Sequence, residues 1–107
     1  MKEIKNLTEY NQIINEGKPV LLDFYADWCG PCRILLPTVE KLANKYEGEF
    51  NIAKVNVDRN PELAQQFGVR SIPALFFINE GKVDESLLGV QTEAKLEAKI
   101  QSYTVAA

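Results

Sequence analysis

A run of almost uninterrupted apolar residues limits the possible folds of this chain more than any other feature. Residues 19–26 read Pro-Val-Leu-Leu-Asp-Phe-Tyr-Ala, and the only charged side chain among them is that of Asp23. A strand with one face in water alternates polar and apolar residues, whereas a strand covered on both faces is apolar almost throughout. The run therefore predicts a central strand in a sheet that is parallel in part and has helices on both faces.

Segments with helical and strand patterns alternate around this run. Helical spacing of apolar residues occurs over residues 7–16, 31–46, 61–67 and from Thr92 onward, and strand patterns occur over 50–57, 75–78 and 83–88. Gly81 in the turn at 79–82 suits a hairpin, so the last two strands should be antiparallel. Residues 2–5 are expected to add an edge strand. The pattern predicts an α/β fold, with a mixed central β-sheet of about five strands flanked by about four helices, in a single domain of residues 1–107.

Local signals refine the first and third helices. Asn6 and Glu9 form a capping pair at the start of the first helix, and spacing places Leu7, Tyr10 and Ile14 on one face. Asn60 is expected to cap the third helix. These assignments predict helices that pack one apolar side on the sheet.

Composition narrows the class of partner. The chain has 107 residues, 46% of them hydrophobic, and a formal net charge of −3. A chain of this size can form a stable core without stabilising disulfides or a structural metal. The net negative charge does not indicate a positively charged surface for binding nucleic acid or an anionic membrane. The N-terminus has no apolar signal segment, and the apolar runs are too short to cross a bilayer. We therefore expect a cytoplasmic monomer whose partners are proteins.

The two cysteines, Cys29 and Cys32, enclose Gly-Pro between the predicted central strand and a predicted long helix. At a helix start, Cys29 faces unpaired backbone N–H groups and the positive end of the helix dipole, which favour the thiolate. Cys32 lies three residues on, close enough to displace whatever Cys29 has captured. This arrangement predicts a redox pair with Cys29 as nucleophile and Cys32 as resolving thiol.

Other uses of the pair are weighed against this one. A disulfide closing so short a ring stabilises a fold by only about 2 kcal/mol, against about 5 kcal/mol for a ring of a hundred residues. A zinc or iron–sulfur site needs about four ligands, and the chain has two cysteines and no histidine. A metal would therefore need a site shared by two chains, such as a bridging cluster. We expect neither a metal nor a cofactor.

The stretch Phe24-Tyr25-Ala26-Asp27-Trp28-Cys29-Gly30-Pro31-Cys32 resembles the active-site signature of the thioredoxin family. Ser71-Ile72-Pro73-Ala74-Leu75 is similar to the family's cis-proline loop, Gly89 to its late active-site glycine, and the order of elements matches along the chain. The resemblance implies a thioredoxin fold and a reductase of protein disulfides, itself re-reduced by a thioredoxin reductase that carries flavin and NADPH. The Gly-Pro dipeptide favours this interpretation over two alternatives, a disulfide oxidase or isomerase and a redox-independent binding subunit of a complex.

The resemblance and the residue chemistry together assign supporting roles to Asp23 and Lys54. Burial beside the cysteines should raise the pKa of the Asp23 carboxyl toward neutrality, and the resemblance assigns it to proton exchange with Cys32. Lys54 on the second strand would reach toward Asp23. The alternatives are a structural carboxyl for Asp23 and an ordinary surface lysine for Lys54.

A substrate-docking surface is also implied by the resemblance. The Ile72–Pro73 bond would be cis and pack against the disulfide, leaving the Ile72 backbone free to pair with an extended substrate. The docking residues around Cys29 would be Trp28, Gly30, Pro31, Ile72, Pro73, Gly89 and Val90. A core position is the alternative for Trp28. The departures from the family pattern, which bear on partner choice, are Tyr25, Arg33, Ala74, Leu88 and Val90.

Overall fold

The apolar run forms β2 (Val20–Tyr25), the central strand of a five-stranded sheet with the order β1-β3-β2-β4-β5 in the computed structural model. On one side β2 pairs in parallel with β3 (Asn51–Asn56), and on the other it pairs antiparallel with β4 (Ala74–Asn79). The edges are β1 (Lys2–Glu3), parallel to β3, and β5 (Lys82–Leu88), antiparallel to β4. The mixed sheet predicted from the sequence is confirmed.

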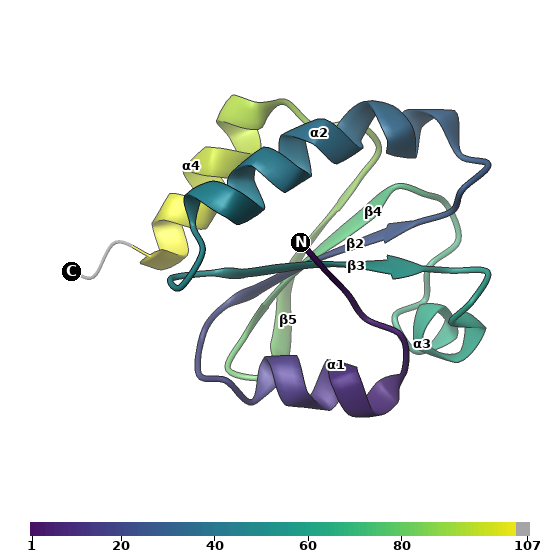
Figure 1. Ribbon diagram of the computed structural model, residues 1–107, viewed down its shortest axis with the longest axis horizontal. Coiled ribbons are helices and arrows are strands. Elements are labelled where there is room, and N and C mark those ends of the chain that lie inside the picture. The colour runs from purple at the N-terminus through teal and green to yellow at the C-terminus, as the bar shows by residue number, and fades with distance from the viewer. Residues whose placement is uncertain (105–107) are drawn as a thin grey trace.

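Helices cover both faces of this sheet (Figure 1). Helices α1 (Leu7–Ile14) and α3 (Pro61–Gln66) lie below it in the view, and α2 (Gly30–Lys45) and α4 (Glu93–Thr104) lie above it. The structure describes residues 1–104, so the last three residues of the predicted domain lie outside the described part.

The two faces of β2 serve different cores because side chains alternate along a strand. Val20, Leu22 and Phe24 pack in the cluster that includes residues of α1 and α3. Leu21 packs with apolar residues of α2 and α4. Asp23 and Tyr25 follow Leu21 on the same face, so the strand brings polar groups to the α2 side near its carboxyl end.

Two predictions about the ends of helices need correction. Helix α1 ends at Ile14, two residues before the predicted end. Asn60 precedes α3 but makes no side-chain capping bond, because its Nδ2 instead donates to the Asn56 carbonyl oxygen over 3.2 Å. The β4–β5 hairpin is confirmed, and both central turn residues, Glu80 and Gly81, have positive φ angles of 53° and 78°.

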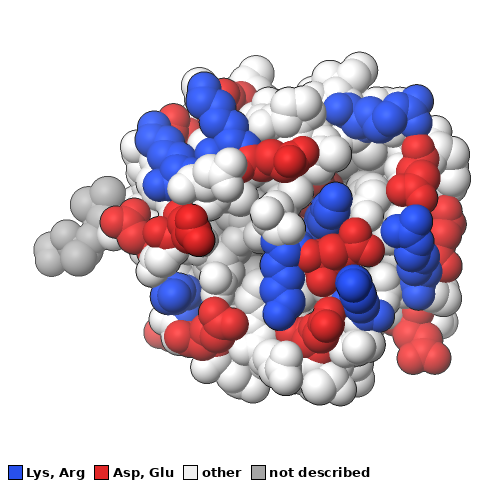
Figure 2. Space-filling view, viewed as in Figure 1, with Lys and Arg blue, Asp and Glu red and all other residues white. Residues whose placement is uncertain are grey.

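The surface carries charges of both signs. Figure 2 shows Lys and Arg interspersed with Asp and Glu on the viewed face. Among residues 1–104, no helix is both long and apolar enough to cross a membrane.

Candidate active site

Cys29 and Cys32 lie where β2 leads into α2. Cys29 is the N-cap of α2, and the Cys32 backbone N–H donates to Cys29 Sγ over 3.2 Å. The two sulfurs form a disulfide, and each residue is 3% exposed. A backbone N–H directed at Cys29 Sγ stabilises negative charge there when the disulfide is reduced.

The loop before β4 packs against this disulfide. The Ile72–Pro73 bond is cis, as the resemblance implied, and the Ile72 carbonyl oxygen lies 3.9 Å from Cys29 Sγ. The Pro73 carbonyl oxygen accepts the Gly89 backbone N–H over 2.9 Å. The loop before β4 therefore connects two other segments: it lies against Cys29 at the start of α2, and it is hydrogen-bonded to the loop after β5.

Apolar side chains are exposed around the meeting point. Trp28 is 68% exposed, so the alternative of a core tryptophan is wrong. Its indole Nε1–H donates to Asp58 Oδ2 over 2.8 Å, which fixes the ring at the surface. Pro31 and Val90 are also exposed, while Gly30, Ile72 and Gly89 are half-buried and Pro73 is buried.

A groove of about 320 Å³ lies beside Trp28. Its lining residues are Trp28, Val57, Ala64, Val69, Arg70, Ser71 and Ile72. Sequence reasoning missed Asp58 and the Val57 side of this groove. One signal was available: β2 and β3 are adjacent parallel strands, so the loops that follow their carboxyl ends meet at the same edge of the sheet.

Asp23 and Lys54 lie on the inner side of the cysteines. Asp23 is 1% exposed, and its Oδ1 accepts no hydrogen bond from the described residues. Burial raises the pKa of the Asp23 carboxyl to about 7, although the charge of Lys54 opposes the rise. The two residues are register partners on β2 and β3.

A cavity of about 240 Å³ connects this pair to the resolving cysteine. It is lined by Asp23, Tyr25, Ala26, Asp27, Cys32, Arg33, Leu36 and Lys54. Asp23 and Cys32 therefore face a shared space, in which a proton can pass between a carboxyl with a near-neutral pKa and a thiol.

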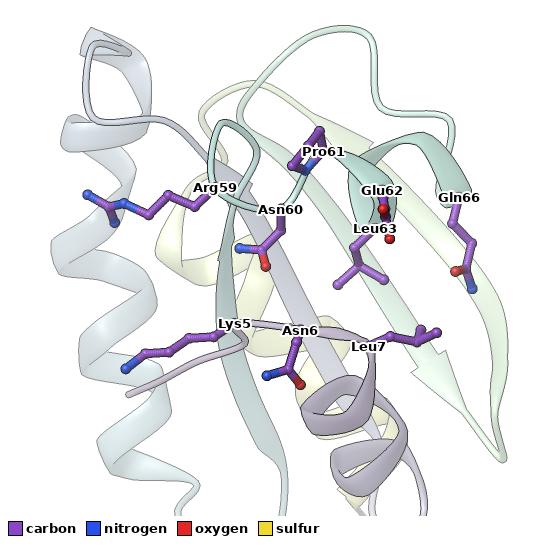
Figure 3. Close-up of a pocket in the computed structure, with 9 residues that line it drawn as sticks. All are labelled: Lys5, Asn6, Leu7, Arg59, Asn60, Pro61, Glu62, Leu63 and Gln66. Carbon is purple, nitrogen blue, oxygen red and sulfur yellow. The ribbon is translucent and has the colours of Figure 1, made fainter.

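A third hollow, of about 270 Å³, lies between the starts of α1 and α3 (Figure 3). Its lining residues are Lys5, Asn6, Leu7, Arg59, Asn60, Pro61, Glu62, Leu63 and Gln66. None of them is a thiol, and none belongs to the predicted site. Within residues 1–104, no cluster of three or more Cys, Asp or Glu side chains is arranged to hold a metal ion.

Comparison with known proteins assigns this geometry to a family. The family model described as Thioredoxin matches residues 2–102. The chain belongs to the thioredoxin family. A thioredoxin of Chlorobaculum thiosulfatiphilum is 46% identical over 92 residues, which cover 86% of this chain and 85% of the relative. A thioredoxin of Alicyclobacillus acidocaldarius is 44% identical over 91 residues, covering 85% of this chain and 87% of that protein.

Solved thioredoxin structures agree with the fold. A mutant thioredoxin from Halobacterium salinarum superposes with a TM-score of 0.91 at 40% identity, covering 99% of this chain and 92% of that one. Fasciola hepatica thioredoxin gives a TM-score of 0.88 at 37% identity, with coverage of 96% and 99%. The thioredoxin fold and the Cys29–Cys32 pair make this chain a thiol–disulfide oxidoreductase.

Proposed function

We propose that this chain reduces disulfides in other proteins, with Cys29 as nucleophile and Cys32 as resolving thiol. In the reduced protein the Cys29 thiolate attacks one sulfur of a substrate disulfide, and the other substrate sulfur leaves as a thiolate. The Cys32 thiolate then attacks Cys29 Sγ and displaces the first substrate sulfur. The substrate leaves as a dithiol, and the protein is left with its Cys29–Cys32 disulfide. The observation that carries this order is the position of Cys29 as N-cap, with the Cys32 N–H directed at its sulfur.

Asp23 and Lys54 are assigned to the second step. Cys32 must lose a proton before it attacks, and a carboxylate with a pKa of about 7 is matched to accept it at neutral pH. The shared cavity supports proton exchange between Asp23 and Cys32. The positive charge of Lys54 favours the ionised Asp23 that this step needs.

The exposed apolar surface around Cys29 receives the substrate. Trp28, Gly30, Pro31, Gly89 and Val90 form its contact area, which suits transient docking of varied proteins. The Ile72 peptide group pairs with an extended substrate segment, and Pro73 keeps that loop beside the sulfurs.

Each turnover leaves the protein oxidised, so it needs an electron donor. We assign this role to a thioredoxin reductase that uses flavin and NADPH, in line with the family. Both cysteines of this chain carry the electrons, and the cycle needs no resident cofactor. We place this cycle in the cytoplasm and assign it to a monomer with one domain.

Trapping of mixed disulfides tests the order of attack. A Cys32→Ser variant should accumulate covalent adducts with disulfide-containing proteins through Cys29, because the resolving thiol is absent. A Cys29→Ser variant should accumulate far fewer, since Cys32 lacks the N-cap position and the backbone N–H that favour a thiolate at Cys29. Gels run without reductant, followed by mass spectrometry of the adducts, measure both. Accumulation mainly in the Cys29→Ser variant would reverse the assignment.

A redox titration tests the direction of electron flow. The protein is equilibrated in dithiothreitol or glutathione buffers at pH 7, and the fluorescence of Trp28, the only tryptophan, reports the state of the neighbouring disulfide. We expect a reversible two-electron couple that is more reducing than the glutathione pool. A strongly oxidising couple would indicate an oxidase or isomerase, and the absence of a reversible couple would contradict every redox role.

A further inference from the structure

Tyr25, at the carboxyl end of β2, contacts Lys54 and Glu3 at the same time. Lys54 Nζ lies 5.2 Å from the centroid of the Tyr25 ring, within the range of a cation–π contact. The Tyr25 hydroxyl donates to Glu3 Oε1 over 2.9 Å. Tyr25 and Lys54 also line the cavity that contains Asp23 and Cys32. One side chain thus joins the edge strand β1 to the interior of the candidate active site.

Each of the two strands beside Lys54 carries a carboxyl side chain next to it. The registers pair Glu3 of β1 with Lys54 of β3, and Lys54 with Asp23 of β2. The three side chains therefore form a row on the α2 face, since register partners on parallel strands point to the same side. Glu3 would be the stronger attractor at neutral pH, because Asp23 is buried and ionises only near pH 7.

Both oxygens of Glu3 are engaged by other groups. Tyr25 donates to Oε1, and Arg59 Nη1 lies 3.6 Å from Oε2. Arg59 also pairs with Asp27 through Nη2 at 2.9 Å. Lys54 forms no ion pair with any carboxylate of residues 1–104, and its ammonium stays over the Tyr25 ring beside the cavity.

We propose that Tyr25 is a positioning residue that keeps the Lys54 ammonium at the Asp23 cavity. The Tyr25 ring binds the ammonium, and the Tyr25 hydroxyl holds Glu3 in a hydrogen bond so that Glu3 does not attract Lys54 away. The charged or titratable groups around this cavity are Asp23, Tyr25, Asp27, Arg33 and Lys54, and also Cys32 once the disulfide is reduced; Glu3 and Arg59 lie behind Tyr25. Of these, Lys54 is the cation whose position the Tyr25 hydroxyl controls. This inference rests on the proposed function only where it concerns the resolving step.

The experiment compares Tyr25→Phe with Tyr25→Leu in the oxidised protein. Phenylalanine keeps the ring but frees Glu3 Oε1, so Lys54 should move toward Glu3. The midpoint of the Asp23 titration, followed by NMR of its carboxyl carbon, should then rise by about half a pH unit, from a change of a few Å in charge separation at an effective dielectric constant near 20. Tyr25→Leu removes the ring as well, and the midpoint should rise further.

A double-mutant cycle separates the proposed role from a general structural one. In a Glu3→Gln background the competing charge is gone, so Tyr25→Phe should no longer move the Asp23 midpoint. The matched control is Tyr46→Phe, because the Tyr46 hydroxyl donates to Glu97 over 2.6 Å, far from this cavity. That control should leave the Asp23 titration unchanged.

Each result has a defined meaning. An unchanged midpoint in both Tyr25 variants overturns the proposal, and an equal shift with and without Glu3→Gln overturns the role of the hydroxyl. The same variants are assayed for release of a preformed mixed disulfide across pH. If the Asp23 midpoint moves but the pH profile of release does not, Tyr25 still positions Lys54, and it is the proton-acceptor role of Asp23 that fails.

Discussion

At the scale of single residues, Asp23 shows a conflict between chemistry and stability. Its carboxyl is buried in an otherwise apolar strand, and its Oδ1 accepts no hydrogen bond from residues 1–104. Such a group is costly to ionise, and burial accordingly raises its pKa to about 7. A residue chosen for stability alone would be apolar here, so the proposed proton exchange with Cys32 gives a reason for the carboxyl.

Replacing Asp23 with asparagine should therefore change how stability depends on pH. In the unfolded chain Asp23 loses its proton near pH 4, but in the folded protein it does so only near pH 7. Between these values the unfolded state binds fewer protons, so the free energy of unfolding of the unmodified protein falls as pH rises and levels off above pH 7. Asp23→Asn removes this fall, which amounts to up to about 4 kcal/mol.

Urea unfolding of the oxidised protein at pH 5 and pH 8 measures this effect. From pH 5 to pH 8 the free energy of unfolding should fall less in the Asp23→Asn variant than in the unmodified protein. An Asp84→Asn variant, changed at an exposed position of β5, should show the same fall as the unmodified protein. A parallel pH dependence in the Asp23→Asn variant would show that Asp23 is not the group responsible. It would also remove the support that a near-neutral pKa gives to proton exchange.

At the scale of elements, sequence reasoning succeeded where the signal was local. The apolar run could predict β2 because a strand covered by α1 and α3 on one face and by α2 and α4 on the other needs apolar residues at almost every position. The β4–β5 hairpin was predictable because Gly81 readily adopts the positive φ that its tight turn requires. Each of these signals lies within about ten residues of the feature that it predicts.

The same reasoning failed where tertiary contacts decide the outcome. Helical spacing put Leu7 on the buried face of α1, but Leu7 is 52% exposed and the buried residues are Tyr10 and Ile13. The angle at which α1 docks on the sheet sets this face, and the spacing alone does not contain it. Asn60 likewise has the residue type of a helix cap, yet its amide is drawn to the Asn56 carbonyl oxygen.

The candidate site shows the same division. The cysteines and Asp23 could be placed from sequence, because they sit in or directly after the central strand. The contacts of Trp28 with Asp58 and of Tyr25 with Glu3 join residues 30 and 22 positions apart. They depend on the strand order β1-β3-β2, which brings the end of β3 and the edge strand beside β2.

At the scale of the whole molecule, the disulfide links redox chemistry to folding. Oxidation and unfolding form a thermodynamic cycle. The free energy of unfolding therefore differs between the oxidised and reduced proteins by the same amount as the free energy of disulfide formation differs between the folded and unfolded chains. Two effects oppose each other. The crosslink restricts the unfolded chain, worth about 2 kcal/mol for so short a ring, while the start of α2 stabilises a Cys29 thiolate and hence the reduced protein.

A protein that works as a reductant needs the first effect to exceed the second. We therefore expect the oxidised protein to unfold at a higher urea concentration than the reduced protein at pH 7, with a difference of up to about 2 kcal/mol in the free energy of unfolding. Urea titrations with and without dithiothreitol, followed by circular dichroism, measure it. A Cys29→Ser/Cys32→Ser double variant must show no response to dithiothreitol. If the reduced protein is the more stable one, folding favours the dithiol, as in a strong oxidant, and the proposed direction of electron flow is wrong.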